Sequence, residues 1–438
     1  MSERSALHRA RICAALLTVA MTACARAAPP LPVPPAAISR DDLPATTPIR
    51  HVIVVIQENR SFNDLFATFP GAHGTTKGKL ANGQSVALRV NSLDSRLDLT
   101  HAFGDYLRDY DRGKMDGFQS ADYQYVAPRD VMPYWKIAKS YVLADNLFQT
   151  QGSGSFTAHQ DLIRGDTQIN SSESLIDFPS KVPWGCDAPP RTTTSVLTLQ
   201  QKYLAYAGPF PCLDYKTMRD LLDAKGISWK YYSPAVVGNT GATWNAFEAV
   251  RSVREGPQWG THVITPSRAI LDDISRGALP DMSWVVPDAV NSDHPGRHSD
   301  TGPSWVAGIV NAVGESAYWK SSAIVILWDD WGGFYDNAPP PFLDLQGGLG
   351  FRVPMLVVSP YARAGYVNHT QYEFGSVLRF VENTWDLGRL GTTDERATGI
   401  GGCLDFHQKP RTFVPIPVKY SRAFFERQRP SNQPVDRG

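Results

Sequence analysis

Three short apolar runs set the strongest limits on what this chain can fold into. The runs are HVIVVI from His51, AIVIL from Ala323 and PMLVVS from Pro354. Each is rich in β-branched residues and is followed directly by polar or turn residues, which is typical of strands buried on both faces of a mainly parallel sheet. Stretches such as FGSVLRFVENTW and TMRDLLDAKG have the pattern of covering helices. The sequence therefore predicts an α/β fold, with a mainly parallel central sheet sandwiched by helices.

The charge balance limits the classes of partner. With 438 residues and 42% hydrophobic residues, the chain is long enough to bury a large core. It has 43 basic and 43 acidic residues and a formal net charge of +0. Nothing in this balance indicates a surface for polyanions, so we expect no nucleic-acid partner.

The first 27 residues have the pattern of a cleaved export signal. A basic lead precedes an apolar segment from Ile12 to about Ala23, and Ala25-Arg26-Ala27 fits a signal peptidase site. The apolar segment is shorter than the roughly 20 residues of a membrane span, and no later run qualifies as one. We expect a periplasmic or secreted protein, with a lipoprotein attached through Cys24 as the alternative.

The remaining chain divides into three parts. Residues 28–48 form a proline-rich linker, whose composition disfavours helix and strand. Residues 49–430 contain no internal repeat and no second linker, so a single folded domain is the simplest interpretation. The polar residues 431–438 form a tail that we expect to fray.

Export would permit a disulfide among the cysteines that follow the leader. Cys186 and Cys212 flank a loop rich in proline and threonine, and a bridge between them would brace it. Cys403 would then be a buried thiol. The sequence alone establishes neither pairing.

Polar side chains follow two of the predicted strands. Glu58 and Asn59 come after HVIVVI, and Asp329 and Asp330 come after the AIVIL run. Parallel strands end at the same edge of a sheet, where ligands bind, so these side chains should converge. Three carboxylates would repel one another without a cation, which indicates one divalent metal ion: Mg²⁺, Ca²⁺ or Mn²⁺, or Zn²⁺ if imidazole joins. The alternative for each acid alone is a solvated loop residue or helix cap.

A glycine-serine turn adds a candidate nucleophile. Ser155 lies in a GSGSF turn four residues before His159, ahead of a helix expected from near Thr157. A hydroxyl there can lie close to a metal and to the amides of a helix N-terminus. A flexible loop is the alternative. The pattern is not the G-x-S-x-G elbow of α/β-hydrolases, because Ser153 occupies the first glycine position.

Five collinear motifs carry a resemblance to a known family. They are ENRSFN, VLADNLFQTQGSGSFTAHQ, NSDHPG, WDDWGGFYDNAPPP and SPYARAGYVNHTQYEFGSVLRFVE, within about residues 49 to 410. Together they resemble the bacterial phosphoesterase family that contains phospholipases C and related acid phosphatases. The resemblance implies an alkaline-phosphatase-like core and metal-dependent hydrolysis of phosphate esters, through a phosphoserine intermediate. The implied substrate is a phosphate ester, including phospholipid.

The family's functional residues map onto matching positions of this chain. The resemblance implies metal ligands at Glu58, Asn59, Asp329 and Asp330, a nucleophile at Ser155, and phosphate-handling histidines at His101, His294 and His159.

Two positions depart from the family pattern, and one alternative function stays open. Asn63 replaces a common aspartate and Asn337 a common histidine, which puts rate, pH optimum and substrate choice in doubt. Large haemolytic members carry additional modules after the core, so we expect a broad-specificity phosphoesterase rather than a haemolytic phospholipase. The alternative is a non-catalytic exported surface-binding protein that keeps the fold.

Overall fold

The computed structural model describes residues 47–234, 244–341 and 348–431. All of them belong to one compact unit. The expected signal peptide, nearly all of the expected linker and all but the first residue of the expected tail lie outside the described residues. In the part of the chain that the structure describes, no helix is long and apolar enough to cross a membrane.

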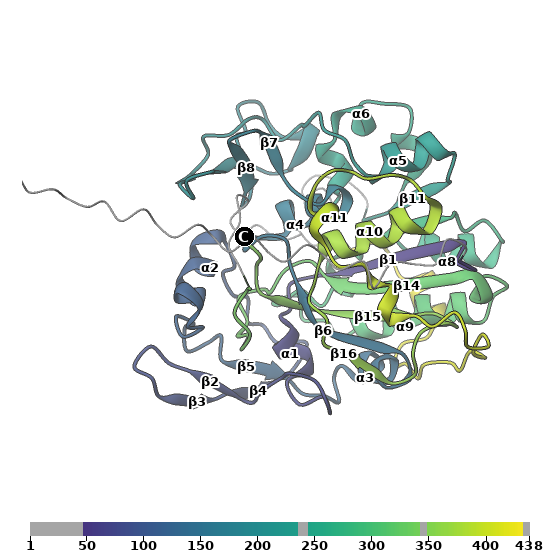
Figure 1. Cartoon of the computed structure of the whole chain (residues 1–438), viewed down its shortest axis with the longest axis horizontal. Helices are drawn as coiled ribbons and strands as arrows, with labels where there is room; N and C mark the ends of the chain where they lie inside the picture. Colours follow the sequence, from purple (N-terminus) through teal and green to yellow (C-terminus); the bar gives the residue numbers. More distant parts are fainter. Residues whose placement is uncertain (1–46, 235–243, 342–347, 432–438) are drawn as a thin grey trace, which may run out of the picture. The chain divides into compact units, whose positions relative to one another are not determined.

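A nine-stranded sheet forms the centre of the molecule (Figure 1). The three apolar runs form β1, β14 and β15, which lie next to one another and are buried along nearly their whole length. Burial on both faces explains why these strands are continuously apolar. In spatial order the strands are β12 (Val263–Ile264), β11 (Trp229–Tyr232), β13 (Met282–Val285), β1 (His51–Gln57), β14 (Ser322–Trp328), β15 (Arg352–Val358), β6 (Val142–Phe148) and β16 (Tyr366–Asn368), with β17 (Tyr372–Glu373) also paired to β6.

The direction of the strands confirms a mainly parallel sheet, with one strand reversed. β1 pairs in parallel with both β13 and β14. β15 runs antiparallel to β14 and to β6, so the PMLVVS run is not one of the parallel strands. A strand in the middle of this sheet is buried on both faces whichever way it runs, so its hydrophobicity does not indicate its direction. The end of β15 consequently lies at the edge of the sheet opposite to the ends of β1 and β14.

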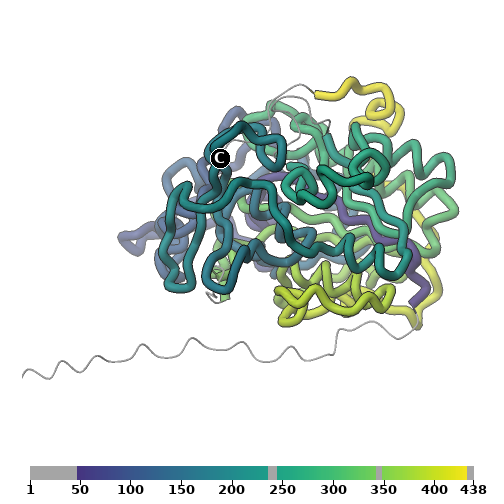
Figure 2. The backbone as a smooth tube through the Cα atoms, turned by 90° about the horizontal axis from the view of Figure 1, so that it is seen from above, coloured from purple at the N-terminus to yellow at the C-terminus, as the bar shows by residue number. Residues whose placement is uncertain are grey.

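Helices cover both faces of the sheet, as the sequence predicts. The two stretches named from sequence form α10, with the expected bounds, and α5, which is one residue shorter at each end. Figure 2 shows the yellow-green segment that contains α10 and the yellow C-terminal segment that contains α12 on opposite sides of the sheet. The helices are α1 (Phe62–Phe66), α2 (Phe103–Tyr110), α3 (Met132–Ser140), α4 (Ser155–Arg164), α5 (Met218–Lys225), α6 (Arg251–Arg254), α7 (Trp259–His262), α8 (Ala269–Ser275), α9 (Gly302–Gly314), α10 (Phe374–Trp385), α11 (Thr393–Arg396) and α12 (Arg422–Arg427).

Three smaller sheets lie outside the central one. Their strands are β2 (Lys77–Lys79), β3 (Ser85–Ala87), β4 (Arg89–Asn91), β5 (Gln124–Val126), β7 (Gln168–Asn170), β8 (Glu173–Ile176), β9 (Ser195–Thr198) and β10 (Tyr203–Leu204). One of these sheets is a four-stranded antiparallel sheet with the order β10-β9-β8-β7, in which a long irregular loop joins β8 to β9. The other two are the strand pairs β2-β3 and β4-β5, which come earlier in the chain. A disulfide joins Cys186 and Cys212, as anticipated, and Cys403 is a buried thiol outside it.

Candidate active site

The ends of β1 and β14 bring the predicted acidic residues together. The two strands are in parallel register up to the pair Gln57 and Trp328, so the next residues, Glu58 and Asp329, emerge side by side. The backbone N–H of Asn59 donates to Oδ1 of Asp329 at 2.9 Å. The convergence expected from sequence is therefore present, and it follows from the parallel direction of neighbouring strands.

The turn after β1 holds Asn59 in an unusual backbone conformation. Its φ is +58°, in the left-handed region that non-glycine residues seldom adopt. The chain passes so close to this residue that a Cβ on Gly332 would lie 2.1 Å from the carbonyl oxygen of Asn59. Gly332 also has a positive φ, and its N–H donates to Oδ1 of Asp330 at 2.8 Å. Glycine at this position lets the two acidic segments approach each other.

Helix α4 supplies a serine and a histidine to the same place. It begins at Ser155, two residues earlier than expected, with Gly154 as its N-cap. Residues four apart lie on one face of a helix, so Ser155 and His159 both point toward the strand ends. His159 Nε2 lies 2.9 Å from Oε1 of Glu58, and the same nitrogen lies 3.6 Å from Oδ2 of Asp329.

Three of these residues form a group with the geometry of a metal site. One ligand atom each from Glu58, His159 and Asp329 lies within 4.8 Å of the others, and all three residues are buried. His159, for which the resemblance implies a phosphate-handling role, is thus one of three residues that could hold a metal ion.

Ser155 and Asp330 complete the cluster. Oγ of Ser155 donates to Oδ2 of Asp330 at 3.2 Å, and Nδ2 of Asn59 lies 3.3 Å from the same Oγ. Nδ2 of Asn59 also contacts both carboxylate oxygens of Asp330 at 3.0 Å. The hydroxyl of Ser155 therefore has a carboxylate acceptor on one side and a polar amide on the other, in a position at the N-terminus of α4 that favours an anion.

The two remaining histidines lie beside this cluster. His101 Nδ1 lies 2.8 Å from the carbonyl of Leu99, and His294 Nδ1 lies 2.7 Å from that of Pro295. A carbonyl can only accept, so each Nδ1 carries a proton. His101 Nε2 lies 3.0 Å from Nδ2 of Asn59, and the two imidazole rings lie 6.3 Å apart.

Burial makes the cluster electrostatically unfavourable without a cation. It raises the pKa of Asp329 well above its usual range, and the neighbouring Glu58 raises it further. Burial lowers the pKa of His159, against the opposing effect of Asp329 and Asp330. Among the described residues, Oδ2 of Asp329 and Oδ1 of Asn59 have no hydrogen-bond partner. Buried carboxylate and amide oxygens that accept no hydrogen bond are suited to coordinate a divalent cation.

A match to a protein-family model shows to which family the chain belongs. A model of the Phosphoesterase family matches residues 49–388. The chain belongs to this family. The chain is similar to a non-hemolytic phospholipase C of Pseudomonas aeruginosa, with 25% identity over 77% of this chain and 54% of that protein. Phospholipase C A of Mycobacterium tuberculosis is 25% identical over 76% of this chain and 72% of its own length.

Other similarities are more distant. Non-specific phospholipase C1 of Arabidopsis thaliana is 24% identical over 78% of this chain and 67% of that protein. The chain spans about half the length of the Pseudomonas enzyme and of a Burkholderia pseudomallei non-hemolytic phospholipase C. A structure of murine ectonucleotide pyrophosphatase/phosphodiesterase 5 aligns with 81% of this chain and 100% of that chain at 9% identity, with a TM-score of 0.42. That score is too low to establish a common fold.

The two departures from the phosphoesterase pattern lie away from the acidic cluster. Oδ1 of Asn63 accepts from the N–H of Thr75 at 2.7 Å. Oδ1 of Asn337 accepts from Arg352 at 2.9 Å, and its Nδ2 donates to the carbonyl of His73 at 3.3 Å. The contacts of both asparagines hold loops in place, and none of those described here reaches the acidic cluster.

Sequence reasoning did not include two tryptophans that contact the histidines. Trp331 lies edge-on to His101, with ring centroids 6.0 Å apart, and Trp244 stacks on His294 at 5.7 Å. Trp331 directly follows Asp330, so the WDDW motif itself contained a signal for it. Trp244 is distant in sequence from every motif and had no such signal.

Proposed function

We propose that this phosphoesterase-family protein is an exported hydrolase that cleaves phosphate esters at one divalent metal ion, with Ser155 as the nucleophile. The observation that carries the proposal is the contact between Ser155 and Asp330 at 3.2 Å, beside the group of Glu58, His159 and Asp329. A hydroxyl next to a carboxylate acceptor and a cation site is suited to nucleophilic attack on phosphorus.

Five side chains would hold the metal ion. The carboxylates provide hard oxygen ligands, and the imidazole of His159 extends the choice to Zn²⁺. When bound, the metal supplies Lewis acidity and neutralises the charge of the buried acids. The proposed ligands are Glu58, Asn59, His159, Asp329 and Asp330.

Asp330, besides holding the metal ion, would handle the protons of the reaction together with His101 and His294. Asp330 accepts the hydrogen bond of Ser155 and is placed to take its proton as Oγ attacks phosphorus. The ester bond to the leaving oxygen breaks, and a phosphoserine forms. The leaving oxygen would take up a proton delivered from Nε2 of His101 or His294, since Nδ1 of each ring donates to a backbone carbonyl. Attack by water on the phosphoserine then releases the phosphate product and regenerates Ser155.

A pocket with aromatic and polar walls lies beside Gly154, the residue before Ser155, and its rings could contact the leaving group of an ester. The pocket has a volume of about 410 Å³, and its lining includes Phe178, Trp184, Tyr203 and Tyr206 together with the polar residues Asp177, Ser180, Lys181 and Ser195. Phe178 packs so closely on Gly154 that a Cβ there would lie 2.2 Å from the ring. This contact puts the pocket beside the residue that precedes the nucleophile. An apolar alcohol would bury its surface against these rings.

An assay of three substrates tests the proposal. We expect purified protein with added metal to hydrolyse at least one of phosphatidylcholine, sphingomyelin and a chromogenic phosphomonoester, and chelation to stop the reaction. Phosphocholine as the product would identify a phospholipase C, and free phosphate a phosphatase. Phe178→Ala should raise KM for an ester with a large apolar alcohol more than for a small monoester.

The alternative is a non-catalytic exported surface-binding protein with the same fold. A folded, metal-loaded protein that binds phospholipid vesicles but turns over none of the three substrates would support it. The presence of Ser155 and of all the proposed metal ligands favours the enzyme.

A further inference from the structure

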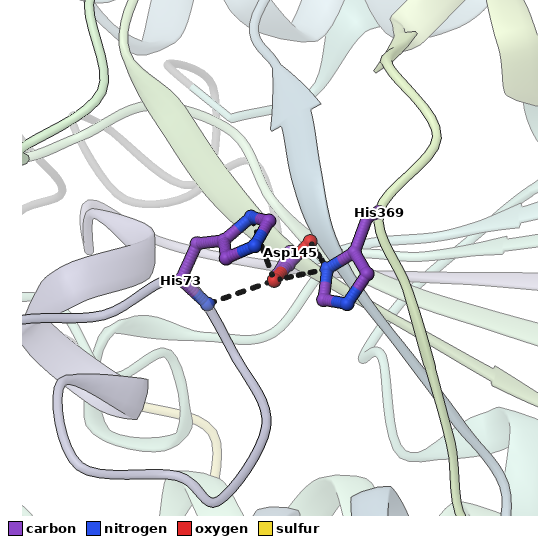
Figure 3. A group of neighbouring side chains, drawn as sticks. All are labelled: His73, Asp145 and His369. Carbon is purple, nitrogen blue, oxygen red and sulfur yellow. Dashed lines mark hydrogen bonds and ion pairs between the residues drawn. The ribbon is translucent and has the colours of Figure 1, made fainter.

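A second group of metal-ligating side chains lies outside the candidate active site. It contains His73 from the loop after α1, Asp145 from the middle of β6 and His369 from the residues after β16 (Figure 3). One ligand atom from each lies within 4.8 Å of the others. The group shares no residue with the cluster around Ser155, so the inference does not depend on the proposed function.

Both imidazoles present the same ring nitrogen to one carboxylate. Nδ1 of His369 lies 2.8 Å from Oδ2 of Asp145, and Nδ1 of His73 lies 3.5 Å from the same oxygen. The two rings are nearly parallel, with centroids 4.2 Å apart. Figure 3 shows both rings directed at Asp145. Two nitrogens and one oxygen that converge in this way form one side of a small coordination site.

Backbone contacts hold each ligand in position. The N–H of His73 donates to Oδ2 of Asp145 at 2.8 Å, which fixes the carboxylate. Nδ2 of Asn146 donates to the carbonyl of His369 at 3.1 Å. Arg352 donates to the carbonyl of His73 at 3.2 Å and to that of Asp145 at 2.8 Å. Such support from outer contacts pre-organises a metal site.

Solvent can reach the group from one side. The Asp145 side chain is fully buried, whereas those of His73 and His369 are 59% and 47% exposed. A buried carboxylate under two half-exposed imidazoles leaves space for water as a further ligand on the open side. A simple hydrogen-bonded histidine pair on an aspartate is the alternative arrangement.

We propose that His73, Asp145 and His369 bind a late first-row divalent ion of the Zn²⁺ class. Two imidazoles and a carboxylate suit Zn²⁺, whereas Mg²⁺ and Ca²⁺ prefer sites made only of oxygen. The ion would join three segments that are distant in sequence, and it would brace the edge of the sheet at β6 and β16. The site is therefore structural, and distinct from the ion at which phosphate esters would be cleaved.

Zinc stoichiometry tests the proposal. Purified protein is equilibrated with Zn²⁺ alone, and bound metal and affinity are measured by elemental analysis and calorimetry. We expect the double variant His73→Asn/His369→Asn to bind one Zn²⁺ per chain fewer than the wild type. His369→Asn alone should weaken the same site by more than about tenfold. Both substituted side chains are half-exposed, so the variants should fold.

Two controls separate this site from the active site. His407→Asn, at an exposed histidine outside the group, should bind Zn²⁺ like the wild type. Binding of Mg²⁺ and turnover of a phosphomonoester should be within about twofold of wild type in the double variant, because the oxygen-rich cluster is intact. Equal Zn²⁺ stoichiometry and affinity in the wild type and the folded double variant would overturn the proposal, whether or not either protein is active.

Discussion

Oγ of Ser155 lies 3.2 Å from Oδ2 of Asp330, and this contact joins the start of α4 to the turn after β14. The serine and the aspartate are 175 residues apart in sequence. The fold brings them together because β6 leads into α4 at the edge of the sheet where β1 and β14 also end.

The stability of the metal-free protein should fall as pH rises, in part because of Asp329. Burial and Glu58 raise its pKa in the folded state, so the folded protein binds a proton that the unfolded chain releases. This stabilising contribution is complete below the unfolded pKa and is lost as pH rises through the folded pKa. Urea unfolding of chelated protein across pH should show the fall, and Asp329→Asn should reduce it. An equal pH dependence in both proteins would contradict this assignment.

His159 should act through the metal ion. We expect His159→Asn to weaken metal binding by more than about tenfold, because one ligand is lost, and excess metal should partly restore turnover. Calorimetry and steady-state rates with increasing metal measure both effects. His407→Asn is the matched control, since that histidine is exposed and distant in sequence. A variant that binds metal normally but has no activity would instead make His159 an acid–base or phosphate-binding group.

Part of this site was predictable from sequence, for a physical reason. Glu58 and Asp329 follow continuous apolar runs, and neighbouring parallel strands end at one edge, so their convergence required no knowledge of the rest of the fold. The reversed direction of β15 was not predictable, because a fully buried strand is apolar in either direction. β6 was not recognised as a strand, because Asp145 and Asn146 interrupt its apolar run.

The sequence did not indicate which residues the histidines would contact. The spacing of Ser155 and His159 gives a common helix face, but it does not tell which strand end that face meets. His73 and His369 lie 72 and 224 residues from Asp145, in segments with no shared pattern. Only the three-dimensional structure brings such residues together.

The disulfide between Cys186 and Cys212 should contribute to stability. It joins residues 26 apart in sequence, and closing a loop of that length stabilises a protein by roughly 3 kcal/mol in the chain-entropy model. The double variant Cys186→Ala/Cys212→Ala should lose a free energy of unfolding of about that size, measured with urea. Non-reducing peptide mapping of the wild type should find the two cysteines linked. Two free thiols in that map would contradict the structure.

The amino terminus should be processed on export. The leader pattern predicts a mature chain that begins near Ala28, with lipid on Cys24 as the alternative. Amino-terminal sequencing and intact mass of the protein from its native host distinguish the two. A cytoplasmic protein that keeps the leader would contradict export altogether.

Ser153 should support the fold and leave the chemistry unchanged. Its Oγ accepts from the N–H of Asp177 at 2.7 Å and from the hydroxyl of Thr157 at 2.8 Å. Ser153→Ala should therefore cost about 1–2 kcal/mol of unfolding free energy, because buried donors lose their acceptor. Turnover should be within about twofold of wild type at a temperature where the variant is folded. Loss of turnover in a folded Ser153→Ala protein would mean that this serine takes part in the reaction.

The turnover of Ser155→Ala protein with its metal bound tests the central claim most directly. We predict a folded variant that binds the wild-type amount of metal but hydrolyses phosphate esters slower by several orders of magnitude, since no neighbouring hydroxyl occupies the same position. Ser153→Ala, measured beside it, controls for disturbance of the same turn. Near-normal turnover by the metal-loaded Ser155→Ala protein would contradict the assignment of Ser155 as the nucleophile.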